Sequence, residues 1–187
     1  MRIAVYSGSF DPLHIGHLAI LERLSADPEF DCAYLVVSPQ NPLKDPSKAA
    51  SARARFDAAV EAVGRHPALK VRVDPIEMEM APPHYTIRTL DALRKREPGN
   101  EFTLVIGADN LAVMRRWKDW DRILSEYGVA VYPRRGHSIP RLRASLMKEE
   151  GAAAFRIRTL NAPMVDISST RIREGLALGE DMSEYLM

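Results

Sequence analysis

Short apolar runs alternate with amphipathic segments along nearly the whole chain. The apolar runs predict strands near residues 3–6, 32–37, 69–73, 102–106, 128–132 and 155–160. The segments between them have helical spacing and predict helices near residues 17–26, 51–65, 85–96, 109–125, 140–149 and 170–178. Strands that alternate with helices are typical of a parallel sheet covered on both faces. The pattern therefore predicts an α/β fold, and 187 residues are most simply one domain, residues 1–187.

Two segments are too rich in proline for a helix and predict loops. One covers residues 39–47 and the other covers residues 79–84. Both come after predicted strands, and ligands of open α/β sheets bind beyond the carboxyl ends of the strands. We therefore expect both loops to flank one crevice, together with the turn that follows the first strand.

The turn after the first strand carries the most informative motif. Residues 8–17 are Gly-Ser-Phe-Asp-Pro-Leu-His-Ile-Gly-His and lead from the strand into a predicted helix. A glycine turn that opens a helix gathers backbone N–H groups at the positive end of the helix dipole, which favours an anion. His14 and His17 are three residues apart, so their imidazoles add donors on one side of this turn. The motif predicts a site for the phosphates of a nucleotide.

Most residues of this motif also have a purely structural interpretation. Gly8, Ser9 and Gly16 would let the backbone approach a nucleotide, or they would only form a tight turn. The two histidines could cap the loop, and a zinc site would need a third ligand that the sequence does not indicate. Asp11 is better suited to shaping the turn before Pro12 than to chemistry.

A second cluster of hydroxyl groups lies near the end of the chain. Ser168, Ser169 and Thr170 follow an apolar segment and precede a predicted helix. Alone, such a cluster indicates only a helix cap. Together with the glycine turn, it predicts a second phosphate-binding helix start with the guanidinium of Arg173 beside it. Arg171 is a weaker candidate, because residues two apart face different sides of a helix.

Composition and charge exclude several classes of protein. Hydrophobic residues make up 46% and charged residues 27% of the chain, as in an ordinary globular protein. The net charge of +1 gives no electrostatic reason to expect a nucleic-acid polymer as partner. Cys32 is the only cysteine, so neither an internal disulfide nor a thiolate metal cluster can form. We find no signal peptide and no stretch near the ~18 apolar residues that span a membrane, so we expect a cytoplasmic protein.

The two phosphate motifs together resemble those of the nucleotidylyltransferase superfamily, which combines a His-x-x-His turn with an Ile-Ser-Ser/Thr-x-x-Arg segment. Within it, the chain is similar to the bacterial nicotinate-nucleotide adenylyltransferases. The matching segments follow the family's order and cover nearly the whole chain, at residues 8–18, 39–44, 85–90, 106–111, 117–120, 134–136 and 167–173. The related pantetheine-phosphate adenylyltransferases share the first motif but lack the Tyr-Thr and Trp-x-x-Trp segments. The resemblance implies a Rossmann-like, doubly wound, mostly parallel sheet with helices on both faces.

The resemblance also implies a reaction, in which an adenylyltransferase transfers AMP from ATP to nicotinate mononucleotide and gives deamido-NAD and pyrophosphate in NAD biosynthesis. The catalytic residues that it implies are His14, His17 and Arg173. It implies ATP contacts for Gly8, Ser9, Phe10, His14, Gly16, His17, Gly107, Asp109, Ile167, Ser168, Ser169, Thr170 and Arg173. It implies mononucleotide contacts for Lys44, Tyr85, Thr86, Asp109, Trp117 and Lys118. Mg²⁺ is expected on ATP, held mainly by phosphate oxygens and water, and no protein ligand to a metal is named.

Several of these residues have a second interpretation. Lys44 could be a solvated loop lysine, and Asp109 could cap a helix as well as accept from a ribose hydroxyl. Trp117 offers a flat face for a pyridine ring and Trp120 could pack into the core, although both could be core residues. Backbone N–H groups near Thr86 and Lys118 would hold the nicotinate carboxylate, because an ionised acceptor strengthens the hydrogen bond.

Two further hypotheses for the function stay open. The enzyme could use nicotinamide mononucleotide or another phosphorylated small molecule. Alternatively, the chain could be a catalytically silent nucleotide sensor on the same fold. The histidine pair and the serine cluster count against a sensor, since a binding protein needs no donors where charge develops. The sequence leaves the oligomeric state open between a monomer and a dimer.

Overall fold

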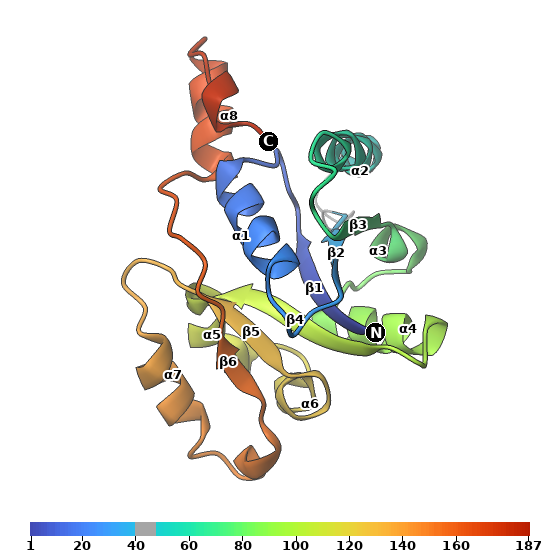
Figure 1. Ribbon diagram of the computed structural model, residues 1–187, viewed down its shortest axis with the longest axis vertical. Coiled ribbons are helices and arrows are strands. Elements are labelled where there is room, and N and C mark those ends of the chain that lie inside the picture. The colour runs from blue at the N-terminus through green and yellow to red at the C-terminus, as the bar shows by residue number, and fades with distance from the viewer. Residues whose placement is uncertain (40–47) are drawn as a thin grey trace.

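The computed structural model describes residues 1–39 and 48–187, so Lys44 lies outside the described residues. The strands are β1 (Arg2–Gly8), β2 (Cys32–Val37), β3 (Val71–Asp74), β4 (Glu101–Gly107), β5 (Val129–Tyr132) and β6 (Ile157–Thr159). They form one six-stranded sheet in the order β3-β2-β1-β4-β5-β6, and every neighbouring pair is parallel (Figure 1). The predicted α/β, Rossmann-like sheet is confirmed.

Helices connect the strands of this sheet. The α-helices are α1 (Ile15–Ser25), α2 (Lys48–Gly64), α3 (Ile76–Glu79), α4 (Thr86–Arg96), α5 (Ala108–Ala112), α6 (Trp120–Arg122), α7 (Ile139–Leu146) and α8 (Ser169–Ala177). The other helical turns are η1 (Met114–Arg116), η2 (Ile123–Tyr127), η3 (Ala152–Ala154) and η4 (Ser183–Tyr185). None of the helices in the described ranges combines the length and the hydropathy required to cross a bilayer.

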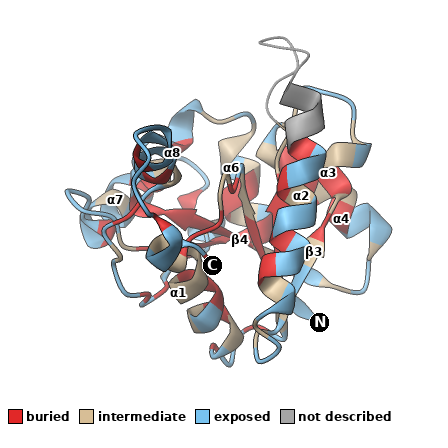
Figure 2. Cartoon of the chain, turned by 90° about the horizontal axis from the view of Figure 1, so that it is seen from above, coloured by how far each residue is buried: buried red, intermediate tan, exposed pale blue. Residues whose placement is uncertain are grey.

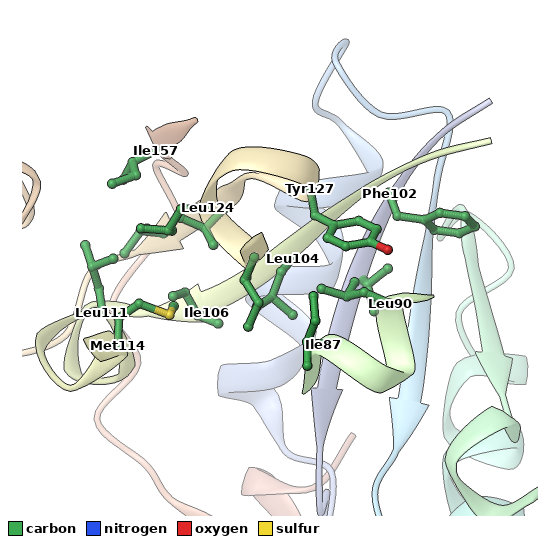
Figure 3. Packing of buried hydrophobic residues seen from close by; sticks show 14 of the residues in the cluster. Ile87, Leu90, Phe102, Leu104, Ile106, Leu111, Met114, Leu124, Tyr127 and Ile157 are labelled. Atoms are coloured by element: carbon green, nitrogen blue, oxygen red, sulfur yellow. The ribbon is translucent and has the colours of Figure 1, made fainter. Parts of the chain in front are cut away.

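Each face of the sheet has its own buried cluster. Successive residues of a strand point to opposite faces, so Ile3 of β1 belongs to one cluster and Ala4 to the other. The first cluster packs against α3, α4, α5, η2 and α7, and Figure 3 shows Leu90 of α4 beside Leu104 of β4. The second cluster packs against α1 and α2, which contribute Leu21 and other residues. The buried residues lie mainly in the sheet and on the inner sides of the helices (Figure 2).

The order of the strands determines where a ligand can bind. From β1 the chain continues to β2 and β3 on one side, and then returns to β4 on the other side of β1. At such a switch point the connections leave the sheet in opposite directions and open a crevice beyond the carboxyl ends of the strands. Here β1 ends at Gly8 and β4 ends at Gly107, so both glycines lie at this edge.

The helix predicted over residues 109–125 is wrong as a single element. The structure divides the segment into α5, η1, α6 and η2. Trp117 has extended backbone (φ −82°, ψ 147°), and Asp119 has left-handed backbone (φ 49°, ψ 44°), so the helical hydrogen bonds stop between them. Aspartate is one of the few residues that adopt the left-handed region. Leu111 and Met114 are nevertheless buried, which explains the helix-like apolar spacing.

Candidate active site

Two imidazoles cap the start of α1 beyond the end of β1. His14 is the N-cap residue, with extended backbone, and its Nδ1 accepts a hydrogen bond from the Gly16 N–H at 3.1 Å. Nδ1 of His17 accepts from the His14 N–H at 3.2 Å. The two side chains thus form a capping box, in which each satisfies one of the free N–H groups at the helix start. The capping alternative from the sequence is therefore true for one nitrogen of each ring.

These capping bonds also assign the tautomer of each ring. Because Nδ1 accepts a hydrogen bond, a neutral imidazole must carry its proton on Nε2. The His14 and His17 rings stack with their centroids 3.7 Å apart and their planes at 26°. Both residues line one cavity. The pair therefore offers two Nε2–H donors to a ligand in that cavity.

Both imidazoles are uncharged at neutral pH. Burial, followed by the charge of Arg134, lowers the pKa of His14 to about 4. Burial lowers the pKa of His17 to about 3, with smaller contributions from His14 and Arg134. Removing a charged group from water disfavours its charged form. In the free protein these rings can therefore attract a phosphate only as neutral hydrogen-bond donors.

Phe10 supports His17 from the core side. Its backbone is left-handed (φ 46°) and its side chain is only 5% exposed. The ring contacts His17 edge to face, with the centroids 5.1 Å apart, and also contacts Tyr6. A Cβ on Gly8 would lie 3.1 Å from the Phe10 ring, so a side chain there would crowd this support. The contact of Phe10 with ATP stays a prediction, and the buried ring leaves the backbone of Phe10 to make it.

The C-terminal serine cluster lies beside the first turn. Ser168 caps α8, and its Oγ accepts from the Arg171 N–H at 3.2 Å. The Ser169 hydroxyl donates to the Pro12 carbonyl at 3.0 Å. The Arg173 guanidinium donates to the backbone carbonyl of Asp11. Figure 1 accordingly places α8 next to the start of α1, although they are more than a hundred residues apart in the chain.

One cavity of about 410 Å³ contains the predicted centre of the site. Of the predicted residues, its lining includes His14, Gly16, His17, Asp109, Ile167 and Ser168. The two imidazoles and the start of α8 thus meet at one cavity, as the two sequence motifs predict. Predicted residues outside this lining are Gly8, Ser9, Phe10, Gly107, Ser169, Thr170, Arg173, Tyr85, Thr86, Trp117 and Lys118. Arg173 braces the first turn, whereas Arg171 lines the cavity.

Arg134 is the main residue that the sequence analysis missed. It follows β5, lines the cavity, and its guanidinium lies 5.1 Å from the centroid of the Tyr132 ring. Its Nε is 3.7 Å from Oδ1 of Asp109. A Cβ on Gly107 would lie 2.3 Å from that carboxylate and 3.1 Å from Arg134, so only glycine leaves room for this pair. The signal was present, because a basic pair directly after a predicted strand lies at the ligand-binding edge.

The residues predicted for the mononucleotide lie on other elements. Tyr85 is 46% exposed and precedes α4, and it gives the helix start no side-chain cap. Thr86 is the first residue of α4, so backbone N–H groups of the first turn are suited to an anion. Trp117 is partly buried and packs against the first of the two buried clusters. Lys118 is exposed and forms an ion pair with Asp119 at 3.3 Å.

No group of three or more His, Cys, Asp or Glu residues within the described part of the chain is arranged to hold a metal ion. Two acidic residues line the cavity: Asp109 pairs with Arg134 at 3.7 Å, and Asp166 pairs with Arg135 at 3.5 Å. The chemistry that this cavity supports is therefore based on neutral and cationic donors, which suits a phosphorylated ligand.

Comparison with known proteins identifies the class. A family model described as cytidylyltransferase-like matches residues 5–175, so the chain belongs to the nucleotidyltransferases. A probable nicotinate-nucleotide adenylyltransferase of Bacteroides fragilis is 35% identical over 185 residues, which are 99% of this chain and 87% of the relative. One from Flavobacterium psychrophilum is 35% identical over 176 residues, 94% of this chain and 86% of the relative. The chain belongs to the nicotinate-nucleotide adenylyltransferase family.

A solved structure supports the same fold. The nicotinic acid mononucleotide adenylyltransferase of Plasmodium falciparum, complexed with NaAD, superposes with a TM-score of 0.74 at 19% identity. The match covers 99% of this chain and 90% of that one. At this identity the likeness concerns the fold alone.

Proposed function

We propose that the protein transfers the adenylyl group of ATP to nicotinate mononucleotide, giving deamido-NAD and pyrophosphate. The observation that carries this proposal is the meeting of two Nε2–H donors and the serine-capped start of α8 in one cavity. The names of the relatives agree with this reaction.

The triphosphate would bind where these groups converge. The start of α8 offers backbone N–H groups and the positive end of its dipole, and Arg134 adds a full charge. His14 and His17 would donate Nε2–H to oxygens of the α- and β-phosphates. A phosphate oxygen of the mononucleotide attacks the α-phosphorus, a new P–O bond forms, and the bond to the β-phosphate oxygen breaks. The negative charge then grows on the departing pyrophosphate, where donors stabilise the transition state.

The mononucleotide would bind between this cavity and α4. Asp109 would accept from a ribose hydroxyl, Trp117 would stack on the pyridine ring, and N–H groups near Thr86 and Lys118 would hold the carboxylate. Lys44 is proposed to reach a phosphate. The first turn of α4 supports this arrangement, since Tyr85 provides no side-chain cap for its N–H groups.

Magnesium enters this proposal as part of the substrate. Mg²⁺ keeps much of its water and is bound mainly through the phosphates of a nucleotide. We expect turnover to require Mg²⁺ with ATP. A cytoplasmic location, and a monomeric or dimeric state, stay predictions.

The test is release of pyrophosphate from ATP with nicotinate mononucleotide, nicotinamide mononucleotide or neither. We expect release with the nicotinate form and a smaller rate with the nicotinamide form. A faster reaction with the amide would favour the alternative substrate, and no release with either would leave the sensor hypothesis.

A pair of histidine variants sharpens this test. His17→Ala should lower kcat by about 10²–10³, the usual effect of losing one transition-state donor. His66→Ala, which removes an imidazole outside the cavity lining, is the matched control. Wild-type turnover in His17→Ala would contradict the mechanism.

A further inference from the structure

A buried arginine lies beneath the glycine turn and has no role in the mechanism so far. Arg55 belongs to α2 and is only 6% exposed. Its Nη1 donates to the backbone carbonyl of Ser9 and, at 3.0 Å, to that of Ser38. Ser9 follows β1 and Ser38 follows β2, so one guanidinium nitrogen links the carboxyl ends of two neighbouring strands.

The surroundings of Arg55 are unusual for a buried cation. Among the residues that the structure describes, no carboxylate forms an ion pair with it, and Nε and Nη2 have no hydrogen-bond partner. Burial lowers its pKa, although the nearby charge of Asp11 acts in the opposite direction. Buried charges are ordinarily paired, and a buried donor without a partner is costly to the folded state. A contribution to stability alone therefore does not explain an arginine at this position.

The bond to Ser9 fixes the direction of the next N–H group. In a trans peptide the C=O and N–H groups point in opposite directions. The Ser9 carbonyl points at Arg55, so the Phe10 N–H points away from α2. Within the described part of the chain this N–H has no backbone acceptor. The strained backbone of Phe10 (φ 46°) is held in the same place by its buried ring against His17.

We propose that Arg55 is a positioning residue for adenylyl transfer, which holds the Ser9–Phe10 peptide so that its N–H faces the phosphates of ATP. The inference rests on the proposed function and adds a residue that acts through the backbone. Arg55 also keeps the Phe10 ring under His17, since both depend on the same peptide. Its effect extends to the binding of the phosphates and is largest in the transition state, because the transferring phosphorus must be aligned with these donors to within a fraction of an ångström.

The experiment compares Arg55→Met with Arg55→Lys. Methionine keeps an unbranched apolar stem but neither charge nor donors, whereas lysine keeps the charge and lacks the planar fork. We expect Arg55→Met to lower kcat by about 10²-fold, the scale for a misplacement near 1 Å, with KM for the mononucleotide changed less than about threefold. Arg55→Lys should recover part of kcat. Binding of inorganic tripolyphosphate, measured by calorimetry without turnover, should weaken in Arg55→Met.

Arg53 supplies the matched control. It lies on the same helix, is 71% exposed at its side chain and pairs with Asp57 at 3.0 Å. Arg53→Met removes the same charge and should leave kcat and tripolyphosphate binding as in the wild type. Circular dichroism would establish that each variant is folded. Should Arg55→Met fail to fold, the kcat of Arg55→Lys decides the matter.

The possible results separate the inference from the proposed function. Wild-type kcat and tripolyphosphate affinity in Arg55→Met, or wild-type kcat in Arg55→Lys when only that variant folds, would overturn the positioning role. A loss of kcat that only follows the folded fraction would overturn it too. Absence of pyrophosphate release from the wild type would instead overturn the proposed function, and tripolyphosphate binding would still report on Arg55.

Discussion

Replacing His17 tests whether its imidazole is neutral in the folded protein. The folded-state pKa is about 3 for His17, lowered from 6.5 mainly by burial. The unfolded chain therefore takes up a proton as the pH falls through about 6.5, while the folded chain takes it up only near its own lower pKa. The contribution of neutral His17 to the free energy of unfolding is fully present above the pKa of the unfolded imidazole and is lost as the pH falls below that value. The same direction holds for His14, with a folded pKa of about 4.

The size of the effect follows from these pKa values. A pH of about 5 lies ~1.5 units below the pKa of the imidazole in the unfolded chain, and one pKa unit corresponds to about 1.36 kcal/mol. Each histidine should then lower the free energy of unfolding by about 2 kcal/mol relative to neutral pH. His17→Gln cannot be protonated, and its amide oxygen can still accept from the His14 N–H. Between neutral pH and about pH 5, the free energy of unfolding of the variant should therefore fall by about 2 kcal/mol less than that of the wild type.

Urea unfolding at about pH 7.5 and about pH 5 measures this difference, because the free energy of unfolding extrapolates linearly in urea. His66→Gln, in a residue outside the cavity lining, controls for the general effect of removing an imidazole. An equal loss of stability in His17→Gln and in the wild type would refute the reasoning. It would mean that His17 is protonated in the folded protein at the same pH as in the unfolded chain.

Three other substitutions test separate parts of the structure. Gly107→Ala would place a Cβ 2.3 Å from Oδ1 of Asp109, so kcat/KM should fall by about 10²-fold with little change in Tm; unchanged kinetics would contradict this. Arg96→Met would remove the 2.6 Å partner of the fully buried Asp74 and leave it the 3.4 Å ion pair with Arg72, so the free energy of unfolding, measured in urea, should fall by about 3 kcal/mol, the low end for breaking a buried pair; an unchanged free energy would contradict this. Trp117→Ala should raise KM for the mononucleotide more than KM for ATP in steady-state kinetics, whereas equal effects would make the ring a core residue.

The central strands β1, β2, β4 and β5 were predictable because each one contains a short apolar run. β2 lies over residues 32–37 as predicted, and β4 and β5 differ from the prediction by about one residue at their ends. A parallel sheet buried on both faces produces such runs, so the local pattern and the tertiary structure agree. The segment 109–125 failed for the opposite reason. Its apolar spacing continues through residues whose backbone, at Trp117 and Asp119, has left the helix.

The parts of the site that were predictable are those encoded by neighbouring residues. His14 and Ser168 each begin a helix, and helix starts have local signatures. Arg134 had a local signal that was overlooked, since it follows a predicted strand, whereas Arg55 acts through residues distant in the chain and in the sequence resembles an ordinary surface arginine. Arg55 is especially misleading, since it belongs to a helix whose neighbour Arg53 is mostly exposed. Only the fold distinguishes the two.

Neutral imidazoles suit a site whose charge arrives with its substrate. Protonation of His14 or His17 would place a hydrogen on Nδ1 and break the capping bonds at the start of α1. Proton uptake therefore opposes the local fold, and Arg134 opposes it as well. A charged pair would hold ATP tightly before reaction and during it, which does not raise kcat. In the proposed reaction, neutral donors would bind the resting triphosphate more weakly than charged ones, and they would still stabilise the negative charge that develops on pyrophosphate in the transition state.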